Sequence, residues 1–179
     1  MDWMSWERLV NKVFGISYTS FYNPACYWKL PRGVYRCGRL KPDCVMIRQA
    51  KQGRKRIFVL DAKRYSYGLT GNVNDLPKVA DIAKQIIYAE YIAEVMEPTA
   101  DVYNAFIMPY SAASEGEVMK HIGIAKTGWK RSHRPYEYVH GILVDSRYLE
   151  RLQEAEYEQA RSLLATTIIF GGTVKVDVR

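Results

Sequence analysis

Two aspartates and a lysine flank one polar turn at a spacing that could bring them together. Asp43 precedes a β-prone run, Asp61 and Lys63 end a second one, and Gly53 lies in the polar segment between the runs. Runs of this kind around a glycine predict a β-hairpin. Residue 52 is the midpoint of Asp43 and Asp61, so antiparallel pairing would set the two carboxylates opposite each other. Because side chains alternate along a strand, Lys63 should project to the same side as Asp61.

Opposed carboxylates repel each other, and a bound cation would remove that repulsion. Their Cβ atoms would lie about 4.5–5.5 Å apart, a separation that a divalent cation can bridge. Mg²⁺ prefers oxygen ligands and binds through one or two carboxylates together with phosphate oxygens. Lys63 could orient or deprotonate an attacking water, or stabilise charge that develops on phosphorus. These groups suit the hydrolysis of a phosphodiester bond, and an ordinary solvated strand end is the alternative.

The elements before the hairpin are predicted from the spacing of apolar residues. Residues 2–14 carry apolar side chains at helical spacing, with Asp2 available as the cap. Glu7 lies at the edge of the apolar stripe of this helix. Residues 16–31 show no sustained period and predict a loop, whose aromatic side chains could cover a hydrophobic edge or stack on bases. Residues 33–39 predict a short strand that leads into the hairpin.

The elements after the hairpin alternate between helices and strands. Residues 64–77 are rich in glycine and polar side chains and predict irregular structure. Residues 78–96 form the clearest helix, because they present an apolar face and Pro98 lies just beyond them. A right-handed crossover would make the next strand parallel to the second hairpin strand. The remaining predicted elements are strands at 102–108, 118–125 and 140–144, a helix at 145–164, and two β-prone runs within 166–178.

Two segments carry cations in a pattern that suits nucleic acid. The hairpin turn places five cations near the expected metal site, where they could position a DNA backbone without reading its sequence. Protection of an exposed strand edge is the other explanation. Residues 126–138 interleave cations with aromatic side chains, which suits either DNA or a protein partner. The candidates for DNA contact are Arg48, Lys51, Arg54, Lys55 and Arg56 in the turn, and Trp129, Lys130, Arg131 and Arg134 in the later segment.

Composition sets the outer limits of these expectations. A chain of 179 residues with 48% hydrophobic and 25% charged residues is in the range of one ordinary globular domain. The net charge of +7 favours a polyanionic partner. Cys26, Cys37 and Cys44 have no paired spacing, so we expect neither a disulfide framework nor a zinc site. We see no signal sequence and no membrane-spanning apolar run, and we therefore expect a cytoplasmic protein with no membrane partner.

The ordered motif resembles that of a known nuclease superfamily. Lys41-Pro42-Asp43, followed by Asp61-Ala62-Lys63, resembles the signature of the PD-(D/E)XK nucleases. A downstream helix with Lys84-Gln85 and Tyr88 is similar to one branch, the restriction endonucleases of the LlaJI and McrC type. The resemblance covers about residues 1–145 and implies an α/β fold with a restriction-endonuclease-like mixed central sheet flanked by helices. It also implies Mg²⁺-dependent cleavage of double-stranded DNA, with Mn²⁺ as an alternative ion.

The resemblance also implies roles for single residues. Asp43, Asp61 and the backbone carbonyl of Ala62 would hold Mg²⁺, with Glu7 as a further ligand, and Lys63 would poise the attacking water. Three helical residues have implied roles as well. Gln85 would help to hold the metal-bound water or a ligand carboxylate, and Lys84 or Tyr88 would touch the phosphate. Ordinary solvated helical side chains are the alternative for the helical candidates.

We therefore expect a single nuclease domain over residues 1–179, with its core at about 1–145 and a C-terminal helix and strand extension at 146–179. Its expected function is that of a metal-dependent endodeoxyribonuclease, the cleavage component of a restriction system in a prokaryotic cell. The partners that the resemblance implies are an AAA+ GTPase motor or a recognition subunit, and a second copy in a homodimer. A repair nuclease or junction resolvase is the alternative enzyme. A non-catalytic DNA-binding or assembly module on the same fold is the alternative outside the enzymes.

Overall fold

A mixed five-stranded sheet forms the centre of the protein in the computed structural model, which describes residues 3–17, 22–113 and 117–171. The strands are β3 (Cys44–Gln49), β4 (Lys55–Ala62), β5 (Asp101–Tyr110), β6 (Met119–Lys126) and β7 (Tyr138–Asp145). Their order across the sheet is β3-β4-β5-β7-β6. β3 and β6, the two edge strands, run antiparallel to their neighbours, whereas β4, β5 and β7 are parallel.

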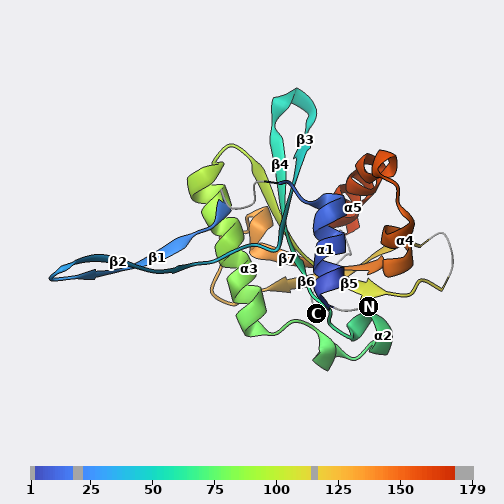
Figure 1. The fold of residues 1–179 in the computed structure, drawn as a ribbon, viewed down its shortest axis with the longest axis horizontal. Helices are drawn as coiled ribbons and strands as arrows, with labels where there is room; N and C mark the ends of the chain where they lie inside the picture. The colour runs from blue at the N-terminus through green and yellow to red at the C-terminus, as the bar shows by residue number, and fades with distance from the viewer. Residues whose placement is uncertain (1–2, 18–21, 114–116, 172–179) are drawn as a thin grey trace.

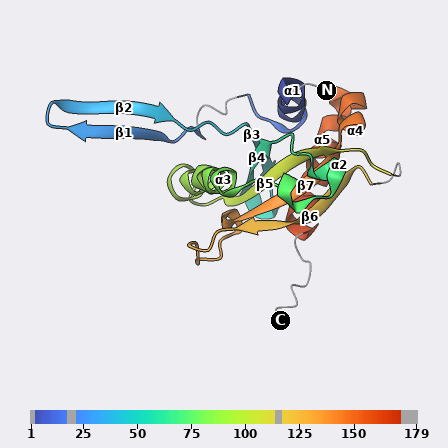
Figure 2. The same ribbon diagram turned by 90° about the horizontal axis from the view of Figure 1, so that it is seen from below.

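Helices cover both faces of this sheet (Figures 1 and 2). Successive side chains of β4 point to opposite faces. Phe58 and Leu60 pack in one apolar cluster with α1 (Trp3–Phe14) and α5 (Tyr157–Gly171). Ile57 and Val59 pack in a second cluster with α3 (Val79–Tyr91). The predicted mixed sheet flanked by helices is therefore confirmed, and the odd-numbered residues of β4 face α3.

α3 confirms the helix that was predicted after the hairpin. Its buried side chains, Gln85, Ile86, Tyr88 and Ala89, lie on the sheet, and it continues as one π-helical turn at Ile92–Met96. The chain then enters β5, which is parallel to β4 as the crossover rule predicted.

The prediction of a loop at residues 16–31 was wrong in its second half, because residues there form a strand. β1 (Ala25–Leu30) pairs antiparallel with β2 (Gly33–Arg39), the strand predicted at 33–39. We call this pair the ribbon; it projects from the body beyond α3 (Figures 1 and 2). At its base, the Leu40 amide donates a hydrogen bond to the Pro24 carbonyl oxygen at 2.8 Å. The β-branched and aromatic residues of the ribbon favour strands, although they bury no apolar face that would give the sequence a period.

Two later predictions also need correction. The segment 64–77 is not fully irregular, since it contains α2 (Tyr67–Thr70) and a 3₁₀ turn at Val73–Asp75. The single helix predicted at 145–164 is two helices, because the backbone becomes extended at Leu152 between α4 (Ser146–Arg151) and α5. The Gln153 and Glu156 side chains then form a capping box that starts the next helical segment.

The end of the chain differs from the predicted strand extension. α5 continues through Gly171, so the first of the two predicted β-prone runs is helical. The second run falls within 172–179, outside the described residues, as does the predicted helix cap Asp2. In the described part of the chain, each helix is too short or too polar to cross a bilayer.

Candidate active site

The register of the β3–β4 hairpin brings Asp43 beside Asp61. Cys44 pairs with Leu60, Val45 with Val59, and the ladder continues in this register to Gln49 and Lys55. The next position beyond Cys44 and Leu60 is Asp43 and Asp61. The hairpin and the opposition of the two aspartates, both predicted from their midpoint, are therefore confirmed.

Lys63 lies against both carboxylates. Its Nζ atom is 3.2 Å from Asp61 Oδ1 and 3.9 Å from Asp43 Oδ2. The Lys63 amide donates a hydrogen bond to the Ile107 carbonyl oxygen at 3.1 Å, so β5 fixes the backbone just past the end of β4. Burial acts to lower the pKa of the Lys63 amine, but Asp61 and Asp43 outweigh burial and raise this pKa. The amine is therefore protonated at neutral pH.

Asp61 is a buried carboxylate without hydrogen bonds. Its side chain is 1% exposed, and neither carboxylate oxygen accepts a hydrogen bond from any residue that the structure describes. The contact with Lys63 at 3.2 Å is an ion pair that lacks hydrogen-bond geometry. Burial and the neighbouring Asp43 raise the pKa of Asp61 to about 8, and Lys63 only partly opposes them. Because neither oxygen accepts a hydrogen bond within the described part of the chain, the ionised Asp61 side chain has lone pairs that are free for a ligand.

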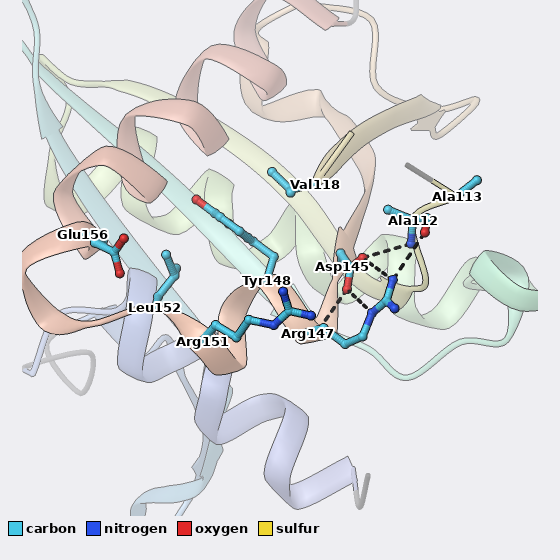
Figure 3. A pocket seen from close by; sticks show the side chains of 9 residues that line it. All are labelled: Ala112, Ala113, Val118, Asp145, Arg147, Tyr148, Arg151, Leu152 and Glu156. Atoms are coloured by element: carbon cyan, nitrogen blue, oxygen red, sulfur yellow. Dashed lines mark hydrogen bonds and ion pairs between the residues drawn. The ribbon is translucent and has the colours of Figure 1, made fainter. Parts of the chain in front are cut away.

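Asp145, at the end of β7, shows what a satisfied buried carboxylate looks like in the same sheet (Figure 3). It accepts hydrogen bonds from the Ala112 amide at 3.0 Å and the Arg147 amide at 2.9 Å, and the Arg147 guanidinium lies 3.1 Å away. Burial acts to raise the pKa of Asp145, but these donors outweigh it and lower the pKa. A cavity of about 510 Å³ opens here, with Glu156 at its other end. Because Asp145 is already bonded, this cavity lacks the unsatisfied oxygens of Asp61.

Glu7 and Tyr88 approach the two aspartates from the helices. Burial raises the pKa of Glu7, and the next largest cause is the negative charge of Asp43. Burial is also the largest cause of the raised pKa of Tyr88, and the negative charges of Asp61 and Asp43 are the next largest causes. The Nζ atom of Lys84 lies 6.0 Å from the centroid of the Tyr88 ring. Glu7 and Tyr88 therefore lie near the aspartate pair, and Lys84 lies beside Tyr88.

Gln85 is buried against the strand that carries Asp61. It is fully buried, and its Nε2 atom donates a hydrogen bond to the Val59 carbonyl oxygen at 2.8 Å. Its Oε1 atom has no partner among the described residues. This contact ties α3 to β4 two residues before Asp61, so Gln85 positions the strand that carries the site.

Sequence reasoning missed Asp81 and Tyr65. The Tyr65 hydroxyl donates a hydrogen bond to Asp81, and the charge of Asp81 contributes to the raised pKa of Lys63. Asp81 precedes Lys84 and Tyr88 by three and seven residues on α3. Because positions i, i+3 and i+7 share one helical face, this spacing could have identified Asp81 as a neighbour of the site.

The expectation that the hairpin turn lies near the metal site was wrong. Asp61 is six residues beyond Lys55 on an extended strand, which separates the two by about 20 Å. Asp43 precedes β3 and Asp61 lies near the end of β4, whereas the turn joins the other ends of these strands. Figure 1 shows this turn at the tip of the hairpin. The two ends of the β3–β4 hairpin are too far apart to meet, so Lys51, Arg54 and Lys55 do not surround the aspartates.

Most of the predicted DNA-contacting cations pair with carboxylates of the protein itself. Five such pairs are present. The pairs are Arg54 with Asp101 at 2.7 Å, Lys55 with Glu97 at 3.0 Å, Arg48 with Glu158, Lys130 with Glu90, and Arg134 with Glu94. Arg48 also donates to the Ser162 hydroxyl at 2.7 Å. Lys51, Trp129 and Arg131 remain exposed.

The donor set around Asp61 fits a hard divalent cation. Within the ranges that the structure describes, no three His, Cys, Asp or Glu side chains gather as a ready-made metal cage. Mg²⁺ does not require one, because it binds through one or two carboxylates and keeps waters or phosphate oxygens. The two unsatisfied oxygens of Asp61, with Asp43 beside them, are such a pair.

Comparison with known proteins identifies the family. No curated protein matches the chain. The sequence model of the family described as LlaJI restriction endonuclease matches residues 2–126, well over half of the chain and the part that holds the aspartate pair, Lys63 and α3. Restriction endonucleases act on DNA. The chain belongs to the LlaJI restriction endonuclease family, and it is a DNA nuclease of a restriction system.

Proposed function

We propose that this chain is a Mg²⁺-dependent endonuclease that hydrolyses phosphodiester bonds of double-stranded DNA as the cleavage component of its restriction system. The observation that carries the proposal is the buried Asp61 carboxylate, whose oxygens accept no hydrogen bond within the described residues and which lies beside Asp43 and Lys63. A buried carboxylate whose oxygens accept no hydrogen bond favours a ligand that compensates its charge. Family membership supplies the DNA substrate.

Each residue of the site has a role in this proposal. Asp43, Asp61 and the Ala62 carbonyl would hold Mg²⁺ or Mn²⁺, with Glu7, whose pKa the charge of Asp43 helps to raise, as a further ligand. When bound, the ion would supply positive charge at the phosphoryl oxygens and lower the pKa of a coordinated water. The Lys63 amine is protonated, so it orients the water by donating a hydrogen bond and stabilises negative charge on the phosphate oxygens. Tyr88 and Lys84 would contact the phosphate from α3.

The protein partners extend this proposal. We propose that an AAA+ GTPase motor or a recognition subunit brings the chain to its target, and that two copies cut the two strands. Plasmid cleavage with and without such a subunit and a nucleotide would test the requirement.

Removal of the lysine amine tests the catalytic assignment. Lys63→Ala should reduce Mg²⁺-dependent cleavage of duplex DNA by about 100-fold or more, since one electrostatic stabiliser is lost. Its DNA affinity, measured without divalent metal, should stay within about twofold of wild type, because the amine acts on one phosphate only. Lys120→Ala, an exposed lysine on β6 at the far edge of the sheet, is the matched control and should cleave normally. Retained cleavage by Lys63→Ala would falsify the assignment.

Metal binding can be measured without cleavage. Mg²⁺ at ten times its Kd should stabilise the wild-type protein by about 1.4 kcal/mol, because it binds only the folded state. Asp61→Asn removes one negative charge and one ligand, so this variant should show no Mg²⁺-dependent rise in Tm. An equal rise in wild type and Asp61→Asn would place the ion elsewhere.

A further inference from the structure

The ribbon exposes an unusual amount of apolar surface. Every residue from Cys26 to Arg39 is exposed, and the side chains include Trp28 at 64% and Tyr35 at 49% exposure. An isolated two-stranded ribbon is marginally stable in water, and contiguous exposed apolar side chains mark interaction sites. The ribbon therefore has the character of a surface that a partner covers.

The charge of the ribbon indicates which partner. Residues 22–42 contain no Asp or Glu but five cations, and none of the four on the ribbon forms an ion pair within the described part of the chain. The four are Lys29, Arg32, Arg36 and Arg39. This differs from the hairpin turn, whose cations are mostly paired. Uncompensated cations on an exposed ribbon complement a polyanion.

Strand register sorts these side chains onto two faces. Tyr27 pairs with Arg36 and Lys29 with Val34, so these four share one face. The Arg36 guanidinium carbon lies 6.0 Å from the centroid of the Tyr27 ring, as neighbours on one face should. Trp28 pairs with Tyr35 on the opposite face. The ribbon thus has a cationic face and an aromatic face.

The base of the ribbon adjoins the candidate active site. The Leu40 amide closes the base on the Pro24 carbonyl, and Asp43 follows Leu40 by three residues. Three extended residues span at most about 11 Å. Lys41, between them, contributes a backbone hydrogen bond and a charge to the surroundings of Tyr88 and Glu7. A ligand along the ribbon would therefore continue towards the aspartate pair.

The dimensions of the ribbon fit one groove of duplex DNA. The major groove is about 12 Å wide and admits a two-stranded ribbon, whose strands are about 4.8 Å apart. The seven residues of β2 extend about 20 Å, over half of the roughly 34 Å that one helical turn occupies.

We propose that the ribbon is a DNA-binding element that lies in the major groove beside the scissile phosphate, with the face of Tyr27, Lys29 and Arg36 towards the DNA. The proposal rests on the proposed nuclease function for its substrate. It adds the surface that holds the duplex while Asp43, Asp61 and Lys63 act on one phosphodiester bond.

Charge removal on the cationic face gives the first test. The double variant Lys29→Ala/Arg36→Ala should bind duplex DNA about tenfold or more weakly than wild type at ~0.1 M salt, measured without divalent metal. The slope of log K against log salt should fall by about 2, one for each lost phosphate contact. Lys120→Ala/Arg151→Ala removes the same charge from exposed positions on β6 and α4. This control should keep the wild-type affinity and slope.

The cysteines give a second test that needs no variant. Cys26 and Cys37 lie exposed on the ribbon, whereas Cys44 is buried and should not react in the folded protein. Bound duplex should slow alkylation of Cys26 and Cys37 several-fold, with the modified sites identified by peptide mass spectrometry.

The outcomes separate this proposal from the nuclease proposal. Lys120→Ala/Arg151→Ala should bind and cleave DNA like wild type, whereas Lys29→Ala/Arg36→Ala should need a higher DNA concentration for half-maximal cleavage. The ribbon proposal is overturned, even if wild type cleaves DNA, when two results occur together. Lys29→Ala/Arg36→Ala binds DNA as tightly as Lys120→Ala/Arg151→Ala, and bound duplex does not slow alkylation of Cys26 and Cys37. A change of oligomeric mass in Trp28→Ala/Tyr35→Ala, with DNA binding unchanged in both double variants, would assign the ribbon to a protein partner and overturn it too. Wild-type protein that binds DNA through the ribbon but never cleaves it overturns the nuclease proposal alone.

Discussion

At the scale of single residues, the buried polar groups around β4 differ in whether their hydrogen bonds are made. Asp145 has its donors, whereas Asp61 has none among the described residues. Gln85 is intermediate, since its nitrogen donates a hydrogen bond to the Val59 carbonyl oxygen while its side-chain oxygen has no partner in the described part of the chain. Unmade hydrogen bonds of buried groups cost stability, and the two free oxygens of Asp61 beside Lys63 are the ones that the proposed metal ion would compensate.

Gln85 is expected to act on stability. Gln85→Ala removes the hydrogen bond to the Val59 carbonyl oxygen and a fully buried side chain. The free energy of unfolding, from urea denaturation, should fall by about 1–3 kcal/mol. Ile87→Ala on the same helix, where Ile87 is 47% exposed, should change it by less than about 0.5 kcal/mol. Unchanged stability in Gln85→Ala, together with loss of Mg²⁺-dependent cleavage, would instead support the catalytic role predicted from sequence.

At the scale of elements, Arg48 connects β3 to α5 through Glu158 and Ser162. If this contact is its main role, Arg48→Ala and Glu158→Ala should each lower the free energy of unfolding by up to about 1 kcal/mol, since the pair is partly exposed. DNA affinity should change little in either variant. A large loss of DNA affinity in Arg48→Ala but not in Glu158→Ala would show instead that Arg48 contacts DNA.

Sequence predicted the elements whose signals are local. The opposition of Asp43 and Asp61 followed from their symmetry about residue 52, beside Gly53, and α3 followed from its apolar period. The partners of Arg48 could not be predicted, because Glu158 is 110 residues away and only the packing of α5 brings it close. β1 was missed for a different reason. Its residues bury nothing, so they lack the alternation by which a strand is recognised.

At the scale of the whole molecule, two histidines couple stability to pH. His121 Nε2 and His140 Nδ1 lie 2.9 Å apart, between β6 and β7. Burial, followed by the charge of His121, lowers the pKa of His140 to about 4. In the unfolded chain this pKa is about 6.5, so the unfolded state binds more protons between pH 4 and 6.5. The free energy of unfolding should therefore fall, by on the order of 3 kcal/mol, as the pH drops through this window.

Asp61 changes the free energy of unfolding with pH in the opposite direction to His140. Because its pKa is raised to about 8, its contribution to stability decreases as pH rises from about 4 to 8. The histidine effect is best measured by urea denaturation in the Asp61→Asn background. There, His140→Gln should flatten the slope between pH 4 and 6.5. Equal slopes with and without His140 would show that another group carries the pH dependence.

The ribbon has a consequence for how such a protein can diverge. None of the residues of β1 and β2 belongs to an apolar core cluster of the described structure, although Tyr22 and Leu40 on either side of them pack on the body. Substitutions on the ribbon should therefore leave the folding of the catalytic body unchanged. Mutations in the ribbon could therefore change which DNA the protein binds without changing the catalytic body. We expect relatives whose catalytic bodies are similar in sequence and whose ribbons differ.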